Sequence, residues 1–301
     1  MKKFLLSALL SLATMSAQAQ EVVTVMYSWS PADSITNINR HTIAEANRIQ
    51  NKYKFIFDAK PGAGGTLAAN HVLSNPNQIL VTSSAFFVRA AMFPDASYDL
   101  SKFTTLMGMC TAPMSITSSK YKSWKEVPND KPLNIGTSGL GVTTHLAALQ
   151  VVAQYPNMQV VPFKSTSEAF VNMVGGSVDF QVGFLSEPEA WGKENNRPVH
   201  VMGITGNRSV NGHATLASQG FDPITNRIEV PFHYVVPASV STDKYNEWRS
   251  ILQKAAKSKQ VRESMSADYC FPTEDLKAPK QWYSEQAVFW RKLSSGVSVN
   301  K

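Results

Sequence analysis

The hexapeptide Pro61–Thr66, Pro-Gly-Ala-Gly-Gly-Thr, has the composition of a turn that binds anions. It lies between an apolar run at 53–57, expected to be a strand, and a run at 67–73, expected to be a helix. Its glycines let backbone N–H groups approach a ligand closely, and a helix that begins there adds a partial positive charge. The segment therefore predicts an anion-binding turn, with an ordinary tight connection as the alternative.

Small hydroxyl residues follow two other predicted strands. Ser83 and Ser84 follow the strand expected at 78–82, and Ser138 follows the strand expected at 133–136. In open α/β sheets, ligands bind at the carboxyl ends of strands, where the first turn of each following helix has free N–H groups. Hydroxyl and amide donors can hold a carboxylate by charge-assisted hydrogen bonds without a cationic partner. Helix capping is the alternative role for Ser83 and Ser84.

The elements that must position these turns alternate along the chain. We expect strands at 22–27, 54–57, 78–82, 133–136, 159–162, 178–182 and 199–205, and helices at 37–51, 67–73, 86–92, 143–153, 165–174, 244–257 and 279–292. This alternation predicts an α/β fold with mainly parallel sheets. We expect the chain to pass between two domains twice, in extended segments near 114–121 and 228–237. Domain I is expected to comprise 20–116 and 234–301, and domain II 117–233.

The first nineteen residues have the pattern of a secretory signal peptide. Lys2 and Lys3 precede an apolar run, and Ala17-Gln18-Ala19 predicts cleavage after Ala19. No cysteine stands at the cleavage point, and no later segment approaches the ~20 apolar residues that cross a bilayer. We expect a periplasmic protein, with an uncleaved N-terminal anchor as the alternative.

Composition argues against several functional classes. The formal net charge is +7, including the two signal-peptide lysines, and no basic run is interleaved with aromatic residues, so nucleic acid is not an expected partner. The sequence has neither a CxxC nor an HExxH pattern, so no metal site and no cofactor are predicted. Cys110 and Cys270 could pair in an oxidising compartment or remain two buried thiols.

A hydrolase is the rival class. Ser138 and His145 could belong to a catalytic triad, but the run 136–140 fails the GxSxG spacing that exposes a nucleophile at a strained turn. The glycines of 136–141 are also in the wrong order for a dinucleotide-binding fingerprint. We predict no catalytic residues.

Taken together, these features resemble the periplasmic solute receptors of tripartite tricarboxylate transporters, the Bug or TctC-type family. The motifs that carry the resemblance are Pro61–Thr66, Met92-Phe93-Pro94 with Tyr98-Asp99, Asn134–Gly141 with His145-Leu146-Ala147, Val161–Lys164, and Gly175–Asp179. The resemblance covers nearly all of the mature chain. It implies a two-domain type II periplasmic-binding-protein fold, a monomer, a small organic acid as ligand, and the membrane permease subunits of a transporter as partners. A receptor that presents its ligand to a sensor is the alternative role.

The resemblance also implies that a carboxylate lies in the cleft between the domains, held by backbone N–H groups, hydroxyls and bridging waters. Carried over to this sequence, the ligand-binding residues would be Trp29, Ser30, Ser34, Gly62, Ala63, Gly64, Gly65, Ser83, Ser84, Ser138, Gly141, Thr143 and Phe184. Trp29 aligns with an aromatic residue that packs on the ligand. A core tryptophan that anchors the loop is its alternative role.

The sequence departs from the family pattern in its first loop, 29–36, which lacks the family's glycines, so we expect the loop to follow a different path. In amino-acid-binding members, the resemblance implies a pocket carboxylate that neutralises the ligand's ammonium group, at positions that correspond to Thr36 and Gly183 here. Neither carries a charge, so we expect a di- or tricarboxylate or an aromatic acid as ligand. Asp33 would change this expectation if the loop turned its carboxylate inward.

Overall fold

The structure is a computed structural model that describes residues 19–33, 35–94, 98–195 and 198–295. Ser34 and nearly all of the predicted signal peptide lie outside these ranges. Within them, no helix combines the length and the apolar character needed to span a membrane.

The N-terminal part of the chain alternates strands and helices, as predicted. Its elements are β1 (Glu21–Tyr27), α1 (Thr36–Arg48), β2 (Tyr53–Ala59), α2 (Thr66–Leu73), β3 (Gln78–Thr82) and α3 (Ala85–Met92). Strand β1 lies between β2 and β3 and runs parallel to both. Side chains alternate across it: Val25 faces the core that includes α1, and Met26 faces the core that includes α2 and α3. The sheet is therefore covered on both faces.

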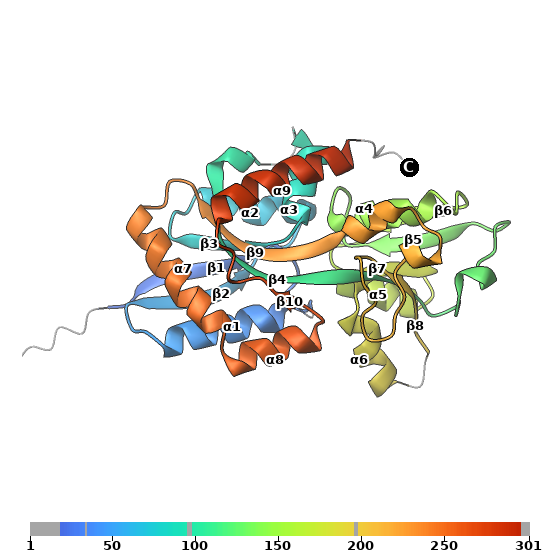
Figure 1. The fold of residues 1–301 in the computed structure, drawn as a ribbon, viewed down its shortest axis with the longest axis horizontal. Helices are drawn as coiled ribbons and strands as arrows, with labels where there is room; N and C mark the ends of the chain where they lie inside the picture. The colour runs from blue at the N-terminus through green and yellow to red at the C-terminus, as the bar shows by residue number, and fades with distance from the viewer. Residues whose placement is uncertain (1–18, 34, 95–97, 196–197, 296–301) are drawn as a thin grey trace, which may run out of the picture.

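A second α/β unit follows. Its elements are β5 (Leu133–Thr137), α4 (Thr143–Val152), β6 (Met158–Pro162), α5 (Thr166–Val174), β7 (Phe180–Phe184), α6 (Ser186–Glu194) and β8 (His200–Ile204). Strand β5 lies between β6 and β7 and is parallel to both. The strands and helices on the right of Figure 1 belong to this unit.

Two long strands connect the units. Strand β4 (Phe103–Ser118) pairs antiparallel with β9 (Glu229–Pro237) up to Pro113, and from Met114 onward it pairs with β7 and β8. Strand β9 also pairs antiparallel with β3. The sheets are thus parallel within each unit and antiparallel around β4 and β9, which corrects the expectation of mainly parallel sheets. Figure 1 shows β4 and β9 running across the middle of the molecule.

The change of partners along β4 separates two lobes. We call residues 19–113 and 229–295 the first lobe and residues 114–228 the second lobe. The domain boundaries expected from the sequence, 116/117 and 233/234, lie close to these limits. With the boundaries expected from the sequence, the first residues of β9 would belong to domain II, although they pair with β4 in the first lobe.

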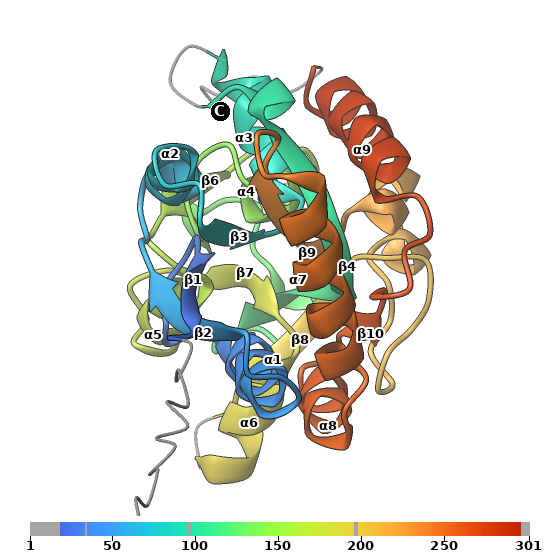
Figure 2. The same cartoon turned by 90° about the vertical axis from the view of Figure 1, so that its left-hand side faces the viewer.

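The C-terminal elements pack on the helices of the first lobe. They are α7 (Thr242–Ala256), α8 (Lys259–Ala267), β10 (Phe271–Pro272) and α9 (Pro279–Ser294). Helix α9 packs on α3, while α7 and α8 pack on α1. Figure 2 shows α7 and α9 beside β9 and β4.

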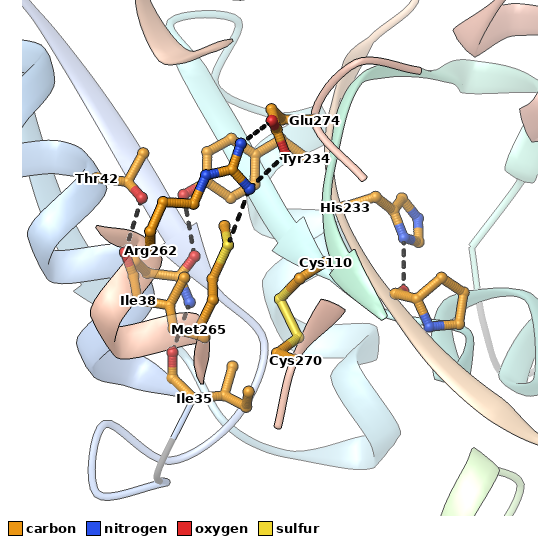
Figure 3. Close-up of a disulfide and its surroundings, with 12 residues drawn as sticks. Ile35, Ile38, Thr42, Cys110, His233, Tyr234, Arg262, Met265, Cys270 and Glu274 are labelled. Carbon is orange, nitrogen blue, oxygen red and sulfur yellow. Dashed lines mark hydrogen bonds and ion pairs between the residues drawn. A yellow bond between two sulfur atoms is a disulfide. The ribbon is translucent and has the colours of Figure 1, made fainter. Parts of the chain in front are cut away.

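A disulfide ties this C-terminal part to β4. Cys110 in β4 is bonded to Cys270, which precedes β10, and their Cα atoms are 5.3 Å apart. Of the two alternatives left open by the sequence, the structure thus shows the pair. Figure 3 shows the bond beside an ion pair between Arg262 of α8 and the buried Glu274. Together these contacts fix α8 and β10 to the centre of the sheet.

Candidate ligand-binding site

A narrow cavity of about 30 Å³ lies between the two lobes. The first lobe contributes the end of β1, the loop after it, the turn after β3 and the start of β9. The second lobe contributes the start of its β4 segment, the turn after β5, the starts of α4 and α5, and the end of β7. The lining residues are Tyr27, Trp29, Asp33, Ser83, Ala85, Met114, Ser138, Val142, Thr143, Thr144, Thr166, Phe184, Val230 and Phe232.

The starts of two helices from different lobes meet at this cavity. Helix α3 begins after Ser84 and helix α4 after Val142. The Ala85 N–H donates to Ser83 Oγ at 3.2 Å and the Phe86 N–H donates to the Ser83 carbonyl oxygen, so the first turn of α3 is capped, which is the alternative role expected for Ser83. Val142 provides no side-chain cap for α4, and the first N–H groups of a helix carry a partial positive charge. Ser83, Ser138 and Thr143 add hydroxyl groups to the same lining, in which none of the described residues is basic.

Side chains and backbone of the two lobes are in direct contact around the cavity. The hydroxyls of Ser84 and Thr143 are hydrogen-bonded at 2.7 Å, and the Ser167 hydroxyl donates to the Asp33 carboxylate at 3.2 Å. On another side, the Arg89 guanidinium donates to the carbonyl oxygen of Leu140 at 3.2 Å. The structure therefore describes the lobes in a closed arrangement.

The turn between β5 and α4 is held by its own polar groups. Ser138 Oγ lies 2.9 Å from Thr144 Oγ1, and the Gly141 N–H donates to His145 Nδ1 at 3.1 Å. Burial lowers the pKa of His145 to about 4, so the ring is neutral at physiological pH. Because His145 bonds the backbone of Gly141 and Ser138 bonds Thr144, the serine and the histidine do not form the nucleophile–base contact that a hydrolase needs.

Two acidic side chains lie at the other side of the cavity. Asp33 is only 6% exposed, and hydrogen bonds reach it from Ser167 and Tyr27. The Ser167 hydroxyl also lies 3.4 Å from Glu187 Oε1, and Gln181 Nε2 lies 3.2 Å from Glu187 Oε2. A hydroxyl has one proton, so Ser167 can donate to only one of these carboxylates at a time.

The pKa values of both acids are raised. Burial raises the pKa of Asp33 to about 6, although hydrogen bonds from Ser167 and Tyr27 act in the opposite direction. Burial also raises the pKa of Glu187 to about 7, and the nearby Asp33 carboxylate adds to the rise. The whole Glu187 residue is only partly buried, but its carboxyl group points inward toward Gln181 and Ser167.

The structure brings several of the predicted ligand-binding residues together. Trp29, Ser83, Ser138, Thr143 and Phe184 line the cavity, and Ser84 lies directly behind it through its bond to Thr143. Trp29 also packs edge-on against Tyr27, so it is both a cavity wall and a core residue.

Other predicted residues lie elsewhere. The glycine turn, 62–65, does not line the cavity; Gly64 instead packs against Val142 and Arg89, and Ala63 is exposed. Gly141 packs against Phe93 of the first lobe. Ser30 accepts a hydrogen bond from the N–H of Ala32 within the first loop and does not line the cavity, and Ser34 lies outside the described residues.

Sequence reasoning missed Glu187 and Ser167 and treated Asp33 only as an exception. The sequence predicts no helix between the strands expected at 178–182 and 199–205, whereas Glu187 lies in helix α6. A proline at the third position of this helix and acidic residues in its first turn are typical of a helix start, and this signal could have found it.

Two α/β lobes joined by β4 and β9, with a cavity between them, form the architecture of a two-domain periplasmic-binding-protein fold. BugD, a periplasmic binding protein, has a TM-score of 0.82 to this structure at 17% identity, covering 91% of this chain and 96% of that chain. MatC from Rhodopseudomonas palustris, solved with bound malate, has a TM-score of 0.80 at 18% identity, covering 91% and 99%. Rpa4515 of R. palustris, solved with adipate, has a TM-score of 0.77 at 15% identity, covering 92% and 97%.

These likenesses show that the chain has the fold of the Bug and TctC-type periplasmic binding proteins, which confirms the predicted fold. No protein-family model and no curated protein sequence matches the chain.

Proposed function

We propose that the protein is a periplasmic solute-binding receptor that captures a small organic carboxylate between its lobes and delivers it to the permease of a tripartite tricarboxylate-type transporter. The observation that carries the proposal is the uncapped start of α4 at a cavity that is also lined by Ser83, Ser138 and Thr143. Such donors bind a carboxylate without a basic side chain. The malate and adipate found in two proteins of the same fold support this ligand class.

In this proposal the protein is a monomeric receptor and not an enzyme. The contacts of Ser138 and His145 support this view, because Ser138 bonds Thr144 and His145 Nδ1 bonds the Gly141 N–H, so the two side chains do not bond each other. Closure of the lobes excludes water, which strengthens charge-assisted hydrogen bonds to the ligand.

Calorimetry and thermal unfolding with a panel of organic acids test the proposal. The protein is first unfolded in urea and refolded without reduction, so that any co-purified ligand is removed. A ligand at about 100 times its Kd should raise the free energy of unfolding by about 2.7 kcal/mol. Ser138→Ala and Thr143→Val should weaken binding by about tenfold each, as expected for the loss of a charge-assisted hydrogen bond.

The matched control is Ser177→Ala, at an exposed serine of the second lobe, which should leave affinity unchanged. Trp29→Ala should weaken binding through the loss of an apolar wall. If no acid of the panel binds the refolded protein while hydrolase assays show turnover, the receptor function is refuted.

A further inference from the structure

Beside the cavity lies a pair of acids, Asp33 and Glu187, that the carboxylate end of a ligand does not need. Asp33 lines the cavity and is almost fully buried, and Glu187 lies behind it across Ser167. Two carboxyl groups this close repel each other when both are ionised. An anionic group placed beside them would add to that repulsion.

Among the described residues, the groups that shift the pKa values of these two acids include no basic side chain, although His41 and Lys193 line a second pocket with Glu187. The groups that face Asp33 are Tyr27, Ser167 and Glu187, and the neighbours of Glu187 add Gln181 and Thr166. None of these groups is a cation. In contrast, two other buried acids each have a basic partner, as Asp179 pairs with Lys120 and Glu274 pairs with Arg262.

The fold makes room for the second acid. A Cβ atom at Gly183 would lie 2.4 Å from Glu187 Oε2 and 1.9 Å from Gln181 Nε2, so only glycine at this position lets both side chains occupy the space at the end of β7. Hydrogen bonds from Gln181 and Ser167 therefore position the carboxyl group of Glu187, in space that is free because residue 183 has no side chain.

The cavity thus offers two opposite chemistries to one small ligand. The start of α4 and the hydroxyls of Ser138 and Thr143 suit a carboxylate, while Asp33, with Glu187 behind it, suits a cation. We infer that the ligand carries an ammonium group beside its carboxylate, so that it is an amino carboxylate whose ammonium group binds Asp33. This inference rests on the proposed receptor function. It replaces the sequence-based expectation of a ligand without an amino group, because that expectation considered only Thr36 and Gly183.

The ammonium group would also change the protonation of the pair. A cation beside Asp33 favours its ionised form and lowers its pKa, so binding near pH 6 should release protons into the buffer. Glu187 lies behind Asp33 and contributes to this release in the same direction, whereas Tyr27, whose pKa is raised by burial, stays neutral.

The test uses acids that differ only in their amino group: glutamate with glutarate, aspartate with succinate, leucine with 4-methylpentanoate, and phenylalanine with 3-phenylpropionate. Each is titrated calorimetrically into the refolded full-length protein. In the pair that fits the cavity, the amino acid should bind at least about tenfold more tightly than the acid without the amine. Titration at pH 6 in buffers of different ionisation enthalpy should show proton release for the amino acid.

Asp33→Asn keeps the size of the side chain and should abolish most of the preference for the amino acid, together with most of the proton release. Asp58→Asn, at an exposed acid of β2, changes the net charge equally and should alter neither. If the acids without an amine bind as tightly as the amino acids, or more tightly, the inference is refuted and the receptor function stands. If neither set binds, the receptor function itself fails.

Discussion

The hydroxyl oxygens of Ser84 and Thr143 lie 2.7 Å apart and join the first lobe to the second. Both side chains are buried, with 0% and 3% of their surface exposed. The bond links the starts of α3 and α4, the two helices whose N–H groups meet at the cavity. A ligand that binds both helix starts therefore acts on the same pair of elements that this bond holds together.

A double-mutant cycle tests whether this bond forms in solution. Ser84→Ala and Thr143→Val should each lower the free energy of unfolding by about 1–3 kcal/mol, because each leaves a buried hydroxyl without its partner. The double variant should lose less than the sum, with a coupling of about 1 kcal/mol in urea unfolding of the ligand-free protein. Combining Ser84→Ala with Ser177→Ala is the additive control. Additive losses for Ser84 and Thr143 would mean that the lobes are apart without ligand.

The contact between Gly141 and Phe93 tests whether lobe closure is needed for binding. A Cβ atom at Gly141 would lie 2.3 Å from Phe93 Cε2, so Gly141→Ala should hold the lobes apart and weaken ligand affinity by at least about tenfold. Gly176→Ala introduces the same backbone strain, since both glycines have positive φ, but its Cβ would meet nothing within 4 Å.

Calorimetry should therefore show weakened binding for Gly141→Ala and unchanged binding for Gly176→Ala. Adding Phe93→Ala to Gly141→Ala should restore part of the affinity. Equal effects of the two glycine variants would contradict a role for the interlobe contact and point to backbone strain alone.

Asp33 should make the stability of the ligand-free protein depend on pH. Its folded-state pKa of about 6 is above the ordinary value of 3.8, so its protonated form is favoured by folding. The associated stability is present below pH 3.8 and is lost as the pH rises through 6. The wild type should therefore lose about 2–3 kcal/mol of unfolding free energy through Asp33 over this pH range, at 1.36 kcal/mol per pKa unit, and Asp33→Asn should not show this loss.

Urea unfolding of the wild type and of Asp33→Asn between pH 4 and 7 measures the effect as the difference between their free energies of unfolding. The pH range is set by the unfolded and folded pKa values of Asp33, 3.8 and about 6. The difference is needed because His145 and His233 have pKa values lowered to about 4 by burial and therefore gain stability as the pH rises. A flat difference curve would contradict the burial of the Asp33 carboxyl group.

The disulfide should contribute strongly to stability, since it closes a loop with a sequence separation of 160 residues. Cys110→Ala with Cys270→Ala should lower the free energy of unfolding by about 2–5 kcal/mol, and reduction of the wild type should have a similar effect. Unfolding curves with and without reductant measure this. The double variant is the control, because reductant should not change its free energy of unfolding. Equal stability of the wild type with and without reductant would contradict a stabilising role of the disulfide.

Much of the fold follows from local patterns in the sequence. The strand at Gln78–Thr82 has the predicted limits, because a short apolar run is bounded by polar turns on both sides. Strand β4 was not recognised at its full length, since Pro113 interrupts a long run that changes partners at this point. Helix α6 was missed because it is short and mostly polar and has Gly192 in its interior, which weakens the helical pattern.

The site could be predicted only in part. Ser83 and Ser138 were predicted near the ligand because ligands bind at the carboxyl ends of strands, a rule that needs no knowledge of packing, and Thr143 was carried over from the family resemblance; all three line the cavity. The positions of Asp33 and Glu187 depend on the path of a loop and on how α6 packs beside β7, and neither is encoded in a local pattern. The glycine turn, 62–65, was expected at the ligand because its local pattern is that of an anion-binding turn. Its position also depends on packing between the lobes, and Gly64 faces Val142.

Strand β9 has a consequence for the order of folding. One edge of β3 pairs with β9, which is made more than a hundred residues later, and α7 to α9 follow later still. During synthesis the first lobe therefore has an unpaired strand edge until the C-terminal segment is made, whereas the helices and parallel strands of the second lobe are contiguous in the chain. Chaperones and proteases would meet the N-terminal part of this chain while its sheet is still incomplete.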